Sequence, residues 1–218
     1  MNGQKFPAAE FSGADLSCRR GGRTVFTGLS FRIVSGEVIV LRGPNGSGKT
    51  TLLRLMAGLA RAVSGTLHWN DADIADDLCA HGARLGFAGH RDAVKSAQTV
   101  RENIAFWASL RGAAPTHVDQ ALNTFGIRHL SDIPARVLSA GQRHRVALAR
   151  VAVSGAPLWL LDEPTNTLDD AALNALRDTL SAHLQRGGMI VMASHGDLFL
   201  PQARALDLRQ TQPAAIAA

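Results

Sequence analysis

The sequence predicts an α/β fold with a mostly parallel core sheet, an N-terminal antiparallel β-layer and a helical subdomain. Short apolar runs alternate with amphipathic stretches toward both ends of the chain, as in a parallel sheet with crossover helices. A glycine-rich loop joins one of those runs to a helix, and a long middle stretch carries only helical patterns. We expect one domain over residues 1–218, with a core of residues 1–91 and 154–210 and an inserted subdomain of residues 92–153.

The composition is that of a globular protein, because 46% of the 218 residues are hydrophobic and 19% are charged. No apolar run reaches the ~20 residues that cross a bilayer, and residues 1–10 hold no apolar signal segment, which indicates a soluble or peripheral protein. Cys18 and Cys79 show no C-x-x-C spacing and the histidines form no cluster, so we expect neither a disulfide nor a transition-metal site. The net charge of +5 is compatible with binding to nucleic acid or to an anionic membrane surface, and equally with a genome that favours arginine codons. The composition does not decide between these explanations.

The first third of the chain predicts short strands. Residues 14–18 and 28–33 alternate in polarity around the Gly21-Gly22 turn and predict a small β-layer. Residues 64–70 predict a further strand that opens at a glycine, and residues 84–88 predict a short apolar strand.

The middle third predicts three helices, each with a capping residue. Thr99 can cap a helix over residues 100–110, and Glu102 completes a capping box. Thr116 is expected to cap a second helix, and Ser139 a third that runs to about Val153. The pattern therefore predicts an all-helical subdomain.

The last third returns to alternating strands and helices. Residues 158–161 and 189–193 are continuous apolar runs and predict buried strands. Between them lies a helix with one leucine-rich face, which Gly187-Gly188 ends. Residues 210–218 are expected to fray.

The glycine-rich loop, residues 43–50 (GPNGSGKT), fits the P-loop pattern G-x-x-x-x-G-K-[ST]. The apolar run 37–41 before it and the helical run 51–57 after it place the loop between a strand and a helix N-terminus, where phosphates bind. Lys49 can reach the β- and γ-phosphates, and the hydroxyl of Thr50 can hold Mg²⁺. We expect the nucleotide-binding residues here to be Gly43, Pro44, Asn45, Gly46, Ser47, Gly48, Lys49, Thr50 and Thr51.

An acidic pair follows the apolar run 158–161. A carboxylate at the C-terminal end of a central strand lies beside the P-loop, so Asp162 can hold Mg²⁺ together with Thr50. Glu163 can position the water that attacks the γ-phosphate. The sequence therefore predicts ATP and Mg²⁺ as cofactors, with Glu163 as a catalytic residue.

Residues 138–142 (LSAGQ) resemble the signature motif of ATP-binding-cassette ATPases. The P-loop, the Asp162-Glu163 pair, Leu168-Asp169 at the D-loop position and His195 after the last strand match this family in order, over essentially the whole chain. The resemblance implies a P-loop NTPase cassette with a RecA-like core. It also implies a homodimer in which each ATP lies between one P-loop and the partner's signature helix. Signature contacts would then come from Ser139, Gly141 and Gln142, and His195 would act on the γ-phosphate beside Glu163.

The chain departs from this family at two places. Cassettes place an aromatic residue some twenty positions before the P-loop to stack on adenine, and this chain has Arg19 and Arg20 there. Stacking on adenine is then expected either from a guanidinium or not at all. The family's glutamine at the end of the strand before the helical subdomain is missing from residues 89–92 (GHRD), and Gln98 lies too far along to be its substitute.

Residues 16–21, 85–90 and 138–150 are similar to the ATP-binding subunit of the bacterial haem exporter of cytochrome c maturation (CcmA type). This implies a peripheral protein on the cytoplasmic side of the inner membrane, docked under CcmB-type permease subunits and associated maturation proteins. The residues themselves show no haem-ligand set. Two alternatives stay open: a cassette subunit for another substrate, or a soluble cassette ATPase acting on nucleic acid or ribosomes. Direct nucleic-acid binding is not expected.

Overall fold

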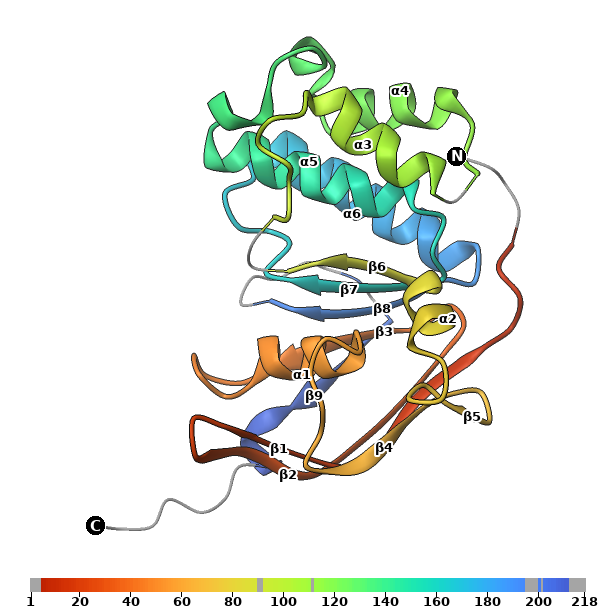
Figure 1. The fold of residues 1–218 in the computed structure, drawn as a ribbon, viewed down its shortest axis with the longest axis vertical. Coiled ribbons are helices and arrows are strands. Elements are labelled where there is room, and N and C mark those ends of the chain that lie inside the picture. The colour runs from red at the N-terminus through yellow and green to blue at the C-terminus, as the bar shows by residue number, and fades with distance from the viewer. Residues whose placement is uncertain (1–4, 90–91, 111, 195–199, 201, 212–218) are drawn as a thin grey trace.

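The computed structural model describes residues 5–89, 92–110, 112–194, 200 and 202–211 of the chain. Its strands form two sheets, and the predicted α/β class with a parallel core sheet and an antiparallel layer is confirmed (Figure 1). The parallel sheet has the order β6-β7-β8-β3-β9, with β3 (Val38–Arg42), β6 (Leu85–Ala88), β7 (Leu158–Asp162), β8 (Met189–Ala193) and β9 (Ala203–Asp207). The antiparallel sheet has the order β2-β1-β4-β5, with β1 (Glu10–Arg20), β2 (Arg23–Val34), β4 (Ser64–Trp69) and β5 (Ala72–Asp73).

The described residues form six α-helices. They are α1 (Lys49–Met56), α2 (Leu78–Ala83), α3 (Val100–Ser109), α4 (Pro115–Thr124), α5 (Ala140–Val153) and α6 (Asp170–Gln185), with 3₁₀ turns at Arg128–Leu130, Ala135–Val137 and Leu208–Thr211. Of these helices, α3 and α5 begin where the sequence predicts. The capping boxes of Thr99 with Glu102 and of Ser139 with Gln142 are both formed. These caps satisfy backbone donors that the first turn of each helix leaves unpaired.

Two predicted helix starts were wrong. Helix α4 begins at Pro115 with Ala114 as its N-cap, so Thr116 lies inside the first turn. Proline suits this first position because it lacks an N–H and its φ is already helical. Helix α1 begins at Lys49 rather than at residue 51, because Gly48 takes a left-handed φ of 102° at the N-cap.

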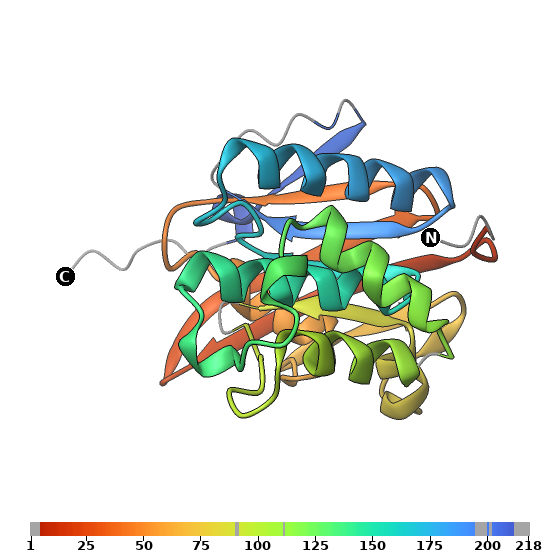
Figure 2. The same ribbon diagram turned by 90° about the horizontal axis from the view of Figure 1, so that it is seen from above.

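The central strands β7, β8 and β3 of the parallel sheet are buried on both faces, and they send alternate side chains to two separate cores. Val38 and Val40 of β3 contribute to the core under helices α3–α6. Ile39 and Leu41 contribute to the other core, which joins α1 and the antiparallel sheet. The molecule is therefore layered, with α1 between the two sheets and α3–α6 on the opposite face of the parallel sheet (Figures 1 and 2).

The sheet order sets the position of the loops that follow the strands. Because β3, β8 and β7 are neighbours and all parallel, their C-terminal ends meet at one edge. Residues 43–50 follow β3, and Glu163 follows β7. Ligands of open α/β sheets bind at this edge.

Within the described residues, no helix is long and apolar enough to cross a bilayer.

Candidate functional site

The loop of residues 43–50 is shaped by glycines that no larger residue could replace without movement. A Cβ on Gly43 would lie 2.6 Å from the Oγ atom of Ser47, and a Cβ on Gly48 would lie 2.5 Å from Val25. Both glycines also have positive φ, at 146° and 102°. Ser47 is buried beneath the loop, and its N–H donates to the carbonyl of Pro44 at 3.1 Å. The path of the loop therefore depends on glycine at positions 43 and 48.

Lys49 lies within this loop, with only 8% of its surface exposed. Its Nζ atom donates to the carbonyl oxygens of Gly43 at 2.8 Å and Pro44 at 3.2 Å. An ammonium group has three protons to donate, and phosphate oxygens are stronger acceptors than carbonyls because they are charged. The lysine is therefore already held where it could exchange these carbonyls for a phosphate.

Thr50 and Asp162 are brought together from positions 112 residues apart in sequence. The hydroxyl of Thr50 donates to the Oδ2 atom of Asp162 at 2.8 Å. Thr50 lies in the first turn of α1, and Asp162 is the last residue of β7 and is buried. A hydroxyl and a carboxylate in contact are the oxygen ligands that Mg²⁺ prefers.

Glu163 is held by its backbone at the edge of the sheet. Its N–H donates to the carbonyl of Ala193 on β8 at 2.8 Å, and its own carbonyl accepts from the N–H of Asn166 at 3.1 Å. Its φ is 53°, a left-handed value that costs a non-glycine residue about 1 kcal/mol or more. Strained backbone of this kind is found at functional sites when the surrounding structure enforces it.

These groups share one pocket of about 480 Å³. The described residues that line it are Arg20, Val25, Asn45, Gly46, Gly48, Lys49, Thr50, Thr51, Asp162, Glu163 and Asn166. Eight of the predicted site residues therefore converge here, while Gly43, Pro44 and Ser47 belong to the loop without lining the pocket. Val25 and Asn166 were not predicted, because neither carries a motif that marks it in the sequence.

The two arginines considered for adenine differ in position. Arg20 lines the pocket. The guanidinium of Arg19 instead donates to the carbonyl of Gly22 at 3.2 Å.

Gln98 does not line the pocket, and its carbonyl accepts from the N–H of Ala135 at 2.8 Å. His195, which was predicted to be catalytic, lies outside the described residues, as do residues 90–91.

The predicted signature residues lie apart from this pocket, at the N-terminus of α5. The Oγ atom of Ser139 accepts from the N–H of Gln142 at 3.2 Å, and the Oε1 atom of Gln142 accepts from the N–H of Ser139 at 2.9 Å. A Cβ on Gly141 would lie 2.9 Å from the carbonyl oxygen of Thr167. Arg145 also pairs with Asp169 at 2.6 Å. The start of α5 is therefore packed against the loop that follows Glu163.

A buried arginine on α5 holds the segment that follows β6. The guanidinium of Arg150 donates to the carbonyls of Asp92 at 2.6 Å and Ala93 at 2.8 Å, and lies 4.8 Å from the ring of Trp107. Burial lowers the pKa of Arg150 to about 10, against the opposing charge of Asp92. Arginine stays protonated at neutral pH, so this anchor persists.

Comparison with known proteins places these features in a family. The chain resembles a solved ATP-binding subunit of an ABC transporter with a TM-score of 0.78, at 22% identity over 85% of this chain and 79% of the other. It also resembles a dimeric ATP-binding cassette solved in a post-hydrolysis state with ADP and phosphate, with a TM-score of 0.77 at 22% identity over 85% and 88% of the chains. These likenesses concern the fold.

Curated relatives are much closer in sequence. The chain is 50% identical to the cytochrome c biogenesis ATP-binding export protein CcmA of Rhodospirillum rubrum, over 95% of this chain and 90% of that protein. It is 48% identical to the protein of the same name from Paramagnetospirillum magneticum, over 92% and 94%, and 45% identical to that of Paracoccus denitrificans, over 92% and 93%. The sequence profile of the ABC transporter family matches residues 26–166. The chain therefore belongs to the ABC transporter family of ATP-binding proteins, in the group of cytochrome c biogenesis ATP-binding export proteins.

Proposed function

We propose that this chain hydrolyses ATP for a membrane exporter of c-type cytochrome biogenesis, the haem exporter. One observation supports ATP hydrolysis: two pairs of residues that are far apart in the sequence line a single pocket. These pairs are Lys49 with Thr50, and Asp162 with Glu163. The export part rests on the names of relatives that share up to 50% of its residues.

Each residue has a role in this proposal. Lys49 exchanges its carbonyl partners for the β- and γ-phosphates, and the N–H groups of the loop bind the remaining phosphate oxygens. Thr50 and Asp162 hold Mg²⁺, which when bound neutralises charge on the phosphates. Glu163 orients a water for in-line attack on the γ-phosphate and accepts its proton. Arg20 stacks its guanidinium on adenine, in place of the aromatic residue that other cassettes use.

A second contact to ATP comes from a second copy of the chain. The N-terminal turn of α5, with Ser139, Gly141 and Gln142, would present to an anion its positive dipole end and the N–H groups of Ala140 and Gly141, which the capping box does not engage. In this homodimer the signature turn of one cassette covers the γ-phosphate in the P-loop of the other. His195 would join Glu163 at that phosphate.

The helical region of residues 92–136 is proposed to face the membrane partners. These partners are CcmB-type permease subunits and associated maturation proteins, with the chain bound peripherally on the cytoplasmic side of the inner membrane. The transported haem would be handled by the partners.

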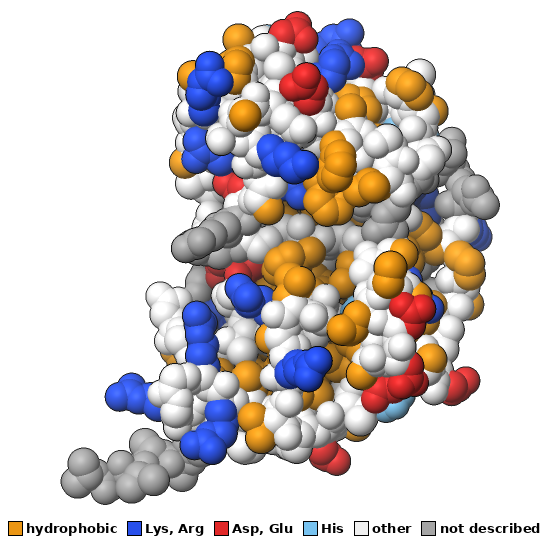
Figure 3. Space-filling view, viewed as in Figure 1, with side chains coloured by type: hydrophobic (Ala, Val, Ile, Leu, Met, Phe, Trp, Pro, Cys, Tyr) orange, Lys and Arg blue, Asp and Glu red, His pale blue; other side chains and the backbone are white. Residues whose placement is uncertain are grey.

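A cassette subunit for another substrate would have the same pocket, and the relatives' names favour cytochrome biogenesis over it. The nucleic-acid alternative has less support. On the face in Figure 3, the Lys and Arg side chains lie at separate positions, and the acidic side chains of the lower half lie mainly on its right-hand side. Binding to a phosphate backbone calls for a clustered basic surface.

A pull-down from detergent-solubilised membranes tests this function. The Glu163→Gln protein with ATP serves as bait, and Lys49→Ala without ATP serves as the control. Recovery of small integral membrane proteins of cytochrome c maturation with the first bait alone supports the proposal. Recovery of unrelated permeases would retain the ATPase role and reject the haem link, and recovery of ribosomes or nucleic acid would reject transport.

A further inference from the structure

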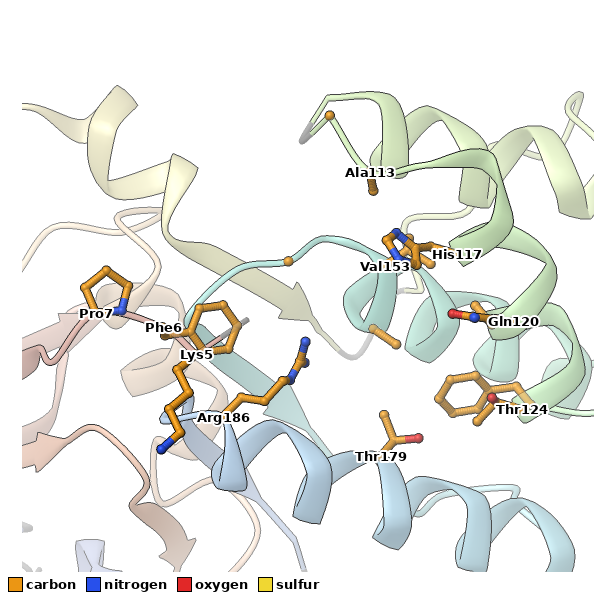
Figure 4. Close-up of a pocket in the computed structure, with 15 residues that line it drawn as sticks. Lys5, Phe6, Pro7, Ala113, His117, Gln120, Thr124, Val153, Thr179 and Arg186 are labelled. Atoms are coloured by element: carbon orange, nitrogen blue, oxygen red, sulfur yellow. The ribbon is translucent and has the colours of Figure 1, made fainter. Parts of the chain in front are cut away.

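A second pocket lies at the edge of the parallel sheet opposite the nucleotide pocket (Figure 4). It has a volume of about 330 Å³ and is formed by residues 5–7, helix α4, the end of α5 and helix α6. Helices α5 and α6 end here, shortly before β7 and β8 begin, whereas the P-loop pocket lies where those strands end. The two pockets are therefore separate sites.

The N-terminal wall of this second pocket is fixed by several contacts of Phe6. The N–H of Phe6 donates to the carbonyl of Arg186 at 2.8 Å. Its ring lies edge-on to His183 with centroids 5.3 Å apart, and the guanidinium of Arg186 lies 5.3 Å from the same ring. The wall is thus preformed, so little ordering is needed when a ligand binds.

The opposite wall is apolar. Ala121 and Phe125 of α4 and Val153 of α5 are buried there. Six of the fifteen lining residues have polar side chains: Lys5, His117, Gln120, Thr124, Thr179 and Arg186. Apolar walls with a small number of polar groups are typical of small-molecule sites, and this volume is at the lower end of their range.

The ionisable side chains that line the second pocket are all basic. Among the described residues that line it, Lys5, His117 and Arg186 have basic side chains and none is acidic. The side chain of Arg186 extends into the space between Phe6 and Thr179, while the amino group of Lys5 points away from it (Figure 4). Burial lowers the pKa of Arg186, which means that its cation is partly desolvated there. A partly desolvated cation gains more from an anionic partner than an exposed one.

We propose that this pocket binds a small amphipathic monocarboxylate. Arg186 would hold the carboxylate through its planar fork of N–H donors, and Ala121, Phe125 and Val153 would cover the apolar chain. Inorganic phosphate lacks the apolar part. The ligand would contact helices α4 and α5 on one side and α6 with residues 5–7 on the other, so it would link these helices to one another and to the N-terminal segment.

Isothermal titration calorimetry with sodium octanoate on the full chain tests this site, with 1-octanol as the neutral probe. Octanoate is expected to bind one per chain and at least ten-fold more tightly than octanol. Phosphate at millimolar concentration should leave octanoate affinity unchanged. Arg186→Gln should weaken octanoate about 10- to 100-fold, the range for a hydrogen bond to a charged group, and leave octanol unchanged.

A second pair of variants avoids dependence on the folding of Arg186→Gln. Gln120 and Asn123 are both exposed on α4, and only Gln120 lines the pocket. Gln120→Trp should abolish octanoate binding by filling the mouth, while Asn123→Trp should bind as the unaltered chain does. Equal affinity for octanoate and octanol, displacement by phosphate, or unchanged binding by Gln120→Trp would each overturn the proposal.

Discussion

The Nε2 atom of His144, on helix α5, lies 3.1 Å from the carbonyl oxygen of Pro164, the residue after Glu163. The Nδ1 atom of the same ring lies 3.0 Å from a carboxylate oxygen of Asp92, in the segment after β6. One side chain thus connects the signature helix to the loop of Glu163 and to the start of the helical region.

His144→Ala is expected to lower kcat for ATP hydrolysis about 3- to 30-fold, because the ring no longer holds the loop after Glu163 through its contacts with Pro164 and Asp92. The KM for ATP should change little, since His144 does not line the P-loop pocket. His144→Gln should recover part of the loss, and His129→Ala, at an exposed histidine, is the control. If His144→Ala keeps the wild-type kcat, His144 does not position the loop after Glu163.

The Thr50–Asp162 contact predicts a specific change in Mg²⁺ dependence. Asp162→Asn replaces an anionic ligand by a neutral one, so the Mg²⁺ concentration for half-maximal ATP hydrolysis should rise at least ten-fold. ATP binding in excess EDTA should be unaffected, because Lys49 and the loop N–H groups remain. The measurement is a Mg²⁺ titration of hydrolysis beside an equilibrium titration with a fluorescent ATP analogue. An unchanged Mg²⁺ midpoint would contradict the assignment.

Gly141→Ala is expected to lower the free energy of unfolding by overpacking the start of helix α5. A Cβ there would lie 2.9 Å from the backbone oxygen of Thr167, so Gly141→Ala must displace the loop after Glu163. Overpacking of this kind costs about 1–3 kcal/mol of unfolding free energy. Ala140→Ser, at the exposed neighbouring position, should stay within about 0.5 kcal/mol. Urea unfolding of the two variants checks this, and equal stabilities would show that the contact is not tight.

Much of this architecture could be predicted from sequence because local physics specifies it. Strands β7 and β8 are buried at every residue, and their continuous apolar runs mark them. The caps Thr99 and Ser139 follow from residue type and spacing. Helix α2 and strands β5 and β9 were not predicted. Strand β9 has no apolar run because it is a largely exposed edge strand, formed through backbone pairing with β3.

The links between distant segments could not be predicted for a different reason. Asp92 and His144 are 52 residues apart, and nothing local to either position encodes their contact. The pocket around Arg186 likewise depends on how residues 5–7 meet α4 and α6. The P-loop site was predictable in part because its motif carries the chemistry in consecutive residues, while Val25 and Asn166 reach it only through the fold.

His183 predicts how stability depends on pH. Burial, with the nearby charge of Arg186, lowers the pKa of His183 to about 3 from an ordinary value of 6.5, and its ring stacks on Trp159 with centroids 3.8 Å apart. Between these values the unfolded chain binds a proton that the folded chain does not. Stability is therefore complete above pH ~6.5 and falls toward pH 3, by up to about 1.4 kcal/mol per pH unit.

His183→Phe keeps a flat ring on Trp159 and removes this titration. Between pH 7.5 and pH 5 the unaltered chain should lose about 2 kcal/mol more unfolding free energy than the variant, by urea denaturation. His81, whose pKa is also lowered by burial, is present in both proteins and cancels in the comparison. Parallel pH profiles for the two proteins would contradict the prediction.

The most direct test of the central claim is single-turnover hydrolysis by Glu163→Gln, measured together with ATP affinity. The amide can neither accept a proton nor carry the carboxylate charge, so hydrolysis should fall at least ~100-fold, the usual minimum for loss of a general base. ATP affinity should stay close to that of the unaltered chain, and ATP should hold the variant as a dimer in size-exclusion chromatography. Hydrolysis at the unaltered rate would show that Glu163 does not position the attacking water.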